Sequence, residues 1–128
     1  MNFKSFVMIM GTLFFLFPLP VSAKGQIPSE VKHIAVVHPG AVISQVRVEQ
    51  LGGGRNLYNI DLEINKPYKD VISFYRQVAE TKKWKVFREV NRDYGYMLMC
   101  HDGHYKIDIT ANSSGNKVMV RLTLEKQY

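Results

Sequence analysis

Cysteine is nearly absent from this chain: Cys100 is the only one among 128 residues. A single cysteine excludes an internal disulfide, and the sequence also lacks the spacing of a closed four-ligand zinc site. The hydrophobic core alone must therefore hold the fold. A lone thiol is either buried or available to a partner, and the place of Cys100 on the apolar face of a predicted strand favours a buried, inert side chain.

Long runs of charge, internal repeats and low-complexity segments are also missing. The net charge is +6, yet the longest basic run is Lys82-Lys83. A positive balance favours acidic partners such as anionic lipid head groups, polysaccharides or nucleic acid. Because the charges are scattered, an ordinary solvated surface accounts for them better. An acidic surface or an anionic polymer stays a candidate partner, whereas no specific nucleic-acid site is predicted.

The one long apolar run lies at the N-terminus. Residues 6–19 are almost entirely apolar, Lys4 precedes them, and small residues lead to Ala23. This order is typical of a secretory signal peptide, and prolines interrupt the run before it reaches the roughly 20 residues of a membrane-spanning helix. We predict a cleaved signal peptide over 1–23 and a single exported domain over 24–128, periplasmic or secreted. Removal of Lys4 lowers the net charge to +5.

Changes in hydrophobic periodicity predict the fold class. Period-two alternation indicates strands, whereas apolar residues at three- and four-residue steps indicate an amphipathic helix. We predict an α+β fold with two strands, one helix and four strands, in which a single antiparallel sheet carries the helix on one face. The helix begins at Pro67 with Asn65 as its cap, and 31–37 fits either a strand or a short helix. The predicted strands cover 41–49, 57–64, 84–90, 96–101, 104–111 and 117–125.

Turn chemistry predicts a register for the last three strands. A two-residue turn at Asp102-Gly103 places His101 opposite His104, and a four-residue loop over 113–116 closes the next hairpin. Apolar side chains, including Cys100, then share one face of the sheet. The same register pairs Ala111 with Val118, Asp108 with Arg121 and His104 with Glu125.

Several apolar side chains are predicted on the opposite, outer face of this sheet. They are Phe87, Met97, Met99 and Met119. Contiguous exposed apolar surface on a small domain marks a contact site. We therefore predict a non-catalytic binding or interaction module that contacts a protein partner, or a second copy of itself, through the outer sheet face.

His101 and His104 suggest an alternative function. Residues that face each other across an antiparallel pair have Cβ atoms about 5 Å apart, so two imidazoles there could share one metal. Thioethers from Met97 and Met99 would suit copper, whereas Glu125 nearby would suit zinc. The alternative is therefore a metal-binding periplasmic protein.

A small basic hydrolase is the third interpretation, with His101, His104 and Lys106 on one face. However, no serine lies on the sharp turn that exposes a catalytic nucleophile. Ser44 is expected in the middle of a strand, pointing inward, and Ser73 on the helix. An enzyme is not the expected function, because no complete catalytic constellation is present.

A scattered motif adds a resemblance. Residues 39–41 read Pro-Gly-Ala before a strand, and a helix with Phe74-Tyr75 ends near Trp84. This pattern resembles a loose group of small exported bacterial proteins and lipoproteins, over most of residues 39–86. The resemblance implies the α+β fold and no particular activity. A glycine often precedes the tryptophan in that group, whereas this chain has Lys83.

Overall fold

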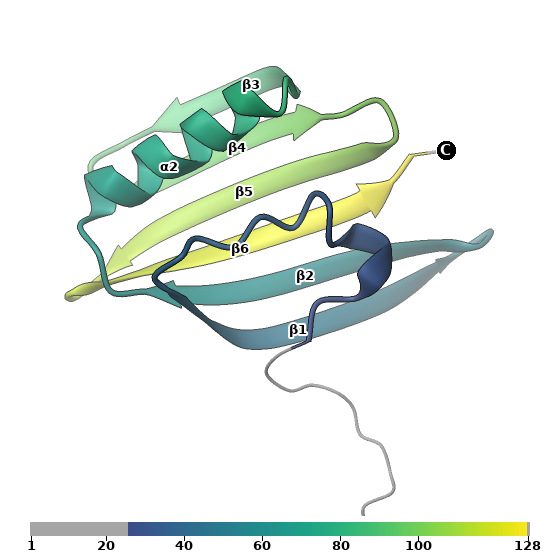
Figure 1. Ribbon diagram of the computed structural model, residues 1–128, viewed down its shortest axis with the longest axis horizontal. Coiled ribbons are helices and arrows are strands. Elements are labelled where there is room, and N and C mark those ends of the chain that lie inside the picture. The colour runs from purple at the N-terminus through teal and green to yellow at the C-terminus, as the bar shows by residue number, and fades with distance from the viewer. Residues whose placement is uncertain (1–25, 128) are drawn as a thin grey trace, which may run out of the picture.

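The computed structural model describes residues 26–127, so the predicted signal peptide lies outside the described residues. Six strands form one antiparallel sheet in the order β1-β2-β6-β5-β4-β3, with β1 and β3 at its edges. One helix connects β2 to β3 and lies on one face of the sheet (Figure 1). The predicted α+β fold class is therefore confirmed. The elements are η2 (Ser29–Val31), β1 (Ala41–Gly52), β2 (Arg55–Ile64), α2 (Tyr68–Thr81), β3 (Lys85–Asn91), β4 (Gly95–His101), β5 (Tyr105–Ser114) and β6 (Lys117–Lys126).

Two segments cover the inner face of the sheet. α2 packs against β5 and β6, while residues 27–38 cross the face over β6 and β2 (Figure 1). The segment forms one 3₁₀ turn and then an irregular stretch. Of the two structures considered for 31–37, a strand is therefore ruled out. Val31 and Ile34 are buried in the core, and the Tyr75 hydroxyl donates to the Val36 carbonyl oxygen at 2.9 Å. The N-terminal segment therefore closes part of the core that the helix leaves open. No helix within residues 26–127 is long and apolar enough to cross a membrane.

The start of α2 differs from the prediction. The helix starts at Tyr68 after Pro67, and no side chain caps it, so the predicted Asn65 cap is wrong. Proline's fixed φ suits entry into a helix without such a cap. At the other end, the Trp84 N–H donates to the Ala79 carbonyl oxygen and the Lys83 N–H donates to the Glu80 carbonyl oxygen. These two bonds form the Schellman pattern. Lys83 adopts the left-handed conformation that this pattern requires, with φ 59°.

We expect Lys83→Gly to raise the free energy of unfolding by about 1 kcal/mol, because a side chain in the left-handed region costs about 1–2 kcal/mol. Urea unfolding monitored by circular dichroism measures the change. Lys82→Gly is the matched control: Lys82 has φ −84°, so glycine there relieves nothing and lowers stability. Equal stability of the Lys83→Gly protein and the wild type would contradict the prediction.

The β4–β5 hairpin keeps the predicted faces but not the predicted partners. His101 lies opposite Lys106, and the Asp102 N–H donates to the Tyr105 carbonyl oxygen. The Gly-His dipeptide after Asp102 therefore forms the two-residue loop. The Asp102 carboxylate stabilises this turn by accepting backbone N–H bonds from His104 and Tyr105, at 2.8 and 2.7 Å. The prediction that His101 faces His104 is wrong.

The β5–β6 hairpin is shifted in the same way. Its loop is the two-residue turn at 115–116 instead of the predicted four residues, and Ala111 lies opposite Val120. A shift of two residues changes every partner but leaves each side chain on its face, because strand alternation has period two. The predicted charge pairs are therefore wrong: Asp108 lies opposite Thr123, Glu125 opposite Lys106, and Arg121 opposite Thr110.

A β-bulge in β1 corrects one further prediction. Ile43 lies opposite Leu62 and Gln45 opposite Asp61, so Ser44 is an extra residue between them. Its hydroxyl donates to the Asp61 carbonyl oxygen at 3.2 Å, and its side chain is exposed. The prediction that Ser44 points inward is therefore wrong.

Candidate partner-binding site at the β3 edge

The outer face of the sheet divides into a polar and an apolar part. On β2, β5 and β6 its side chains are mostly polar or charged, and several charges are neutralised by ion pairs. Arg121 binds Asp61 through two bonds of 2.6 and 3.1 Å, Arg55 binds Glu125 at 3.2 Å, and Lys117 binds Glu63 at 3.2 Å. This part of the face is self-complementary in charge, whereas β3 and β4 present the apolar part.

Three of the four predicted contact residues come together on β3 and β4. Met97 lies opposite Val90, and Met99 opposite Arg88. Phe87 is the extra residue of a bulge in β3, is 52% exposed, and has its ring 6.1 Å from the ring of His101. Phe87 therefore lies on the outer side, near His101, and the bulge places Arg88 on the same side opposite Met99.

Met119 does not join this group. It lies on β6 opposite Asn112 and Glu63, so β5 separates it from the methionines of β4. Val90 belongs to the group, although it was not predicted from the sequence. The bulge places Val90 opposite Met97 on the outer face. We call Phe87, Val90, Met97 and Met99 the outer apolar patch.

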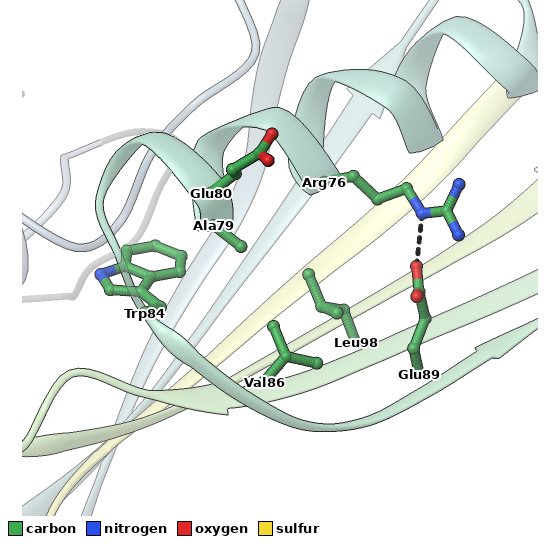
Figure 2. Close-up of a pocket in the computed structure, with 7 residues that line it drawn as sticks. All are labelled: Arg76, Ala79, Glu80, Trp84, Val86, Glu89 and Leu98. Carbon is green, nitrogen blue, oxygen red and sulfur yellow. Dashed lines mark hydrogen bonds and ion pairs between the residues drawn. The ribbon is translucent and has the colours of Figure 1, made fainter.

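A groove runs along the other side of the same edge strand, between β3 and α2 (Figure 2). Its volume is about 520 Å³. We call it the inner groove, and it is lined by Arg76, Ala79, Glu80, Trp84, Val86, Glu89 and Leu98. A second hollow of about 460 Å³ continues from Arg76 toward the start of α2, past Ile72 and Asn91. The inner side of β3 is therefore open on both sides of Arg76.

One polar contact ties the helix to β3 across this opening. The Glu89 carboxylate accepts from Arg76 Nε at 2.6 Å and from the Tyr96 hydroxyl at 2.7 Å (Figure 2 shows the first). The hydrogen bond from Arg76 lowers the pKa of Glu89, whereas burial raises the pKa of Tyr96. Glu89 therefore stays ionised and Tyr96 neutral at ordinary pH, which keeps the contact intact and leaves Glu89 unavailable to a partner.

Positive charge surrounds the beginning of β3. Lys83, Lys85 and Arg88 are exposed, and none of them forms an ion pair within residues 26–127. Lys82 donates to the His33 carbonyl oxygen at 3.1 Å. Val86 and Phe87 lie between these cations and are 44% and 52% exposed. The edge therefore combines apolar side chains with unneutralised positive charge.

The residues suggested for metal binding are separated. His101 lies on the outer face opposite Lys106, His104 lies in the turn, and Cys100 is fully buried on the inner face. In the part of the chain that the structure describes, no three His, Cys, Asp or Glu side chains group as metal ligands. The cross-strand histidine pair that motivated copper or zinc is therefore not formed. His101 and Lys106 do share the outer face, as the hydrolase interpretation assumed, but Ser44 lies on the edge strand β1.

The resemblance to small exported bacterial proteins stays a prediction. A scan against models of protein families, and searches of curated proteins and of solved structures, find no match to this chain.

Proposed function

We propose that this chain is an exported, non-catalytic module that binds a protein partner at the β3 edge of its sheet. The observation that carries the proposal is the convergence on one edge strand of an apolar patch and of a groove with both apolar and charged lining. The outer apolar patch lies on one side of β3 and the inner groove on the other. Aromatic, methionine and arginine side chains are enriched in protein interfaces, and Phe87, Met99 and Arg88 are neighbours here.

The distribution of charge supports the same edge. On β2, β5 and β6 several outer-face charges form ion pairs, as Asp61 does with Arg121, whereas Lys85 and Arg88 form none among residues 26–127. Charged groups left unpaired around an apolar centre are typical of the rim of an interface. Export rests on the predicted signal peptide.

Site-specific photocrosslinking tests this function. We expect a photoreactive phenylalanine analogue at position 87 to form an adduct of one defined mass with an extracytoplasmic protein in the producing cells. The same analogue at Val42, which is 65% exposed on the other edge strand, is the control and should form none. Met99→Asp should reduce the adduct at position 87 by at least about tenfold, since a charge in the apolar centre of an interface removes a large share of the binding energy.

The absence of any adduct at position 87 would contradict the proposal, and so would two other results. One is the same set of adducts from positions 87 and 42, which would indicate random encounters. The other is an adduct whose yield Met99→Asp leaves unchanged. Circular dichroism of the Met99→Asp protein serves as the folding control.

A further inference from the structure

We infer that the partner supplies an extended segment that pairs with β3 as a seventh strand, and that this segment alternates acidic with apolar side chains. The inference rests on the proposed function and specifies its partner. The open edge of β3, the apolar part of the groove beside it and the cations along it each fix one property of this segment.

The backbone of β3 fixes the extended conformation. Within residues 26–127, β3 pairs only with β4, so alternate N–H and C=O groups along its other side have no strand partner there. Such an edge is a template for one more strand, which would lie about 4.8 Å away. Main-chain hydrogen bonds would hold the segment, while its side chains would point alternately to the two faces of the sheet.

The inner groove fixes the apolar positions. Val86 lies opposite the buried Cys100, on the inward side of β3, yet is 44% exposed because nothing described covers it from the edge. Trp84, Ala79 and Leu98 line the groove next to it. An apolar side chain of the added strand opposite Val86 would enter this volume of about 520 Å³ and remove apolar surface from water.

The bulge at Phe87 fixes the acidic positions. Lys85 lies opposite His101 and Arg88 opposite Met99, which are two residues apart on β4. Lys85 and Arg88 therefore face outward beside successive outward residues of β4, and Phe87 is the extra outward residue between them. Opposite charges stabilise a directly opposed cross-strand pair. The added strand should thus carry two acidic residues that flank the apolar residue facing Val86.

A second copy of β3 fits this edge poorly. Antiparallel self-pairing is two-fold symmetric, so the register is set by the residue at its centre. If Val86 of one copy faces Val86 of the other, Lys85 lies opposite Arg88. If the two copies instead meet at Arg88, two arginines lie opposite each other, and if they meet at Glu89, two glutamates do. Directly opposed like charges destabilise a sheet, so the charges favour a different sequence as the added strand.

A designed peptide tests the inference on the mature chain, residues 24–128. The probe is a fluorescent nine-residue peptide of alternating glutamate and valine, followed by fluorescence anisotropy. We expect saturable binding, and at least about tenfold weaker binding of two control peptides. One control replaces glutamate by lysine, and the other has proline at its centre, which cannot donate to the ladder.

Variants of the protein locate the bound peptide. Val86→Glu and Arg88→Glu should each weaken binding by at least about tenfold. The first places a charge against an apolar residue of the probe in the groove, and the second opposes a glutamate of the probe with a like charge. Val48→Glu is the matched control. Val48 lies opposite the buried Tyr58 on the other edge strand and is 48% exposed, close to the exposure of Val86, so this variant should bind like the wild type.

Each other outcome overturns the inference. The added strand is rejected if the probe fails to bind, or if it binds the Val86→Glu and Val48→Glu proteins equally. In that case the proposed function survives if the photocrosslinked adduct at position 87 persists, and it fails as well if the adduct is absent. Binding to phosphatidylglycerol vesicles that depends on Arg88 but not on Val86 assigns the edge to a lipid surface. A dimer in sedimentation velocity that Val86→Glu dissociates assigns it to a second copy.

Discussion

Cys100 should react with a thiol reagent at least about a thousandfold more slowly in the native protein than in concentrated urea. The side chain is fully buried, and its sulfur lies 3.6 Å from the Ile107 carbonyl oxygen. Burial raises the pKa of the Cys100 thiol to about 12, while only the thiolate reacts. Native labelling therefore requires opening of the sheet, and an unfolding free energy of about 5 kcal/mol gives a factor of this size.

The absorbance change of a chromogenic disulfide reagent at mildly alkaline pH measures this rate. A Cys100→Ala protein that carries Val42→Cys is the control, because position 42 is 65% exposed and should label rapidly in the native state. Rapid native labelling of Cys100 itself would mean that β4 presents its other face to the core. The assignment of Met97 and Met99 to the outer face would then be wrong as well.

The same thiol should make stability depend on alkaline pH. Its pKa is raised from 9.0 to about 12 by folding, so the fold favours the protonated form. This contribution is fully present below pH 9 and is lost as the pH rises from about 9 toward 12, by at most about 1.4 kcal/mol per pH unit. Comparison of the wild type with Cys100→Ala by urea unfolding isolates the effect from that of the buried tyrosines, which both proteins share.

Val31→Asp should lower the free energy of unfolding by more than about 3 kcal/mol, a large part of the total stability of a domain of this size. Val31 has no exposed surface, and it lies in the N-terminal segment that covers the sheet over β6 and β2 (Figure 1). Among the described residues, no polar or charged side chain is buried in this core. A carboxylate at position 31 would therefore lose its hydration without gaining an ion pair.

The neighbouring residue provides the control for this measurement. Lys32 is exposed, so Lys32→Asp should change stability by less than about 0.5 kcal/mol in urea unfolding followed by circular dichroism. Similar stabilities of the two variants would show that residues 27–38 do not close the core. The domain would then consist of the sheet and α2 alone.

On β4, β5 and β6 the strand faces were predictable from the sequence, whereas the strand partners were not. Cys100 and Ile107 were correctly assigned to the core because burial repeats every two residues. Hydrophobicity cannot distinguish registers that differ by two residues, so the predicted register depended on which residues form the turn. Asp102-Gly103 was taken as the turn, but the Asp102 carboxylate instead accepts two N–H groups from the residues after Gly103 and moves the loop on by one residue. The histidine pair was lost with that shift.

The candidate site at the β3 edge was predictable only in part, for a different reason. Phe87, Met97 and Met99 were found from alternation, because they depend on the strand alone. The inner groove depends on how far α2 lies from the edge of the sheet, which no local pattern specifies. The bulge at Ser44 was hidden as well, because the residues around it alternate in sequence as an unbroken strand would.

The two edges of this sheet differ in a way that limits assembly. β1 spans 12 residues but is interrupted twice, by extra residues at Ser44 and Leu51, whereas β3 is interrupted once, near its start. Head-to-tail growth into a filament requires two regular, complementary edges on every copy, and an irregular edge blocks it. Addition of the proposed strand at β3 would therefore occupy the less interrupted of the two described edges, and we expect a complex with a stoichiometry of one to one.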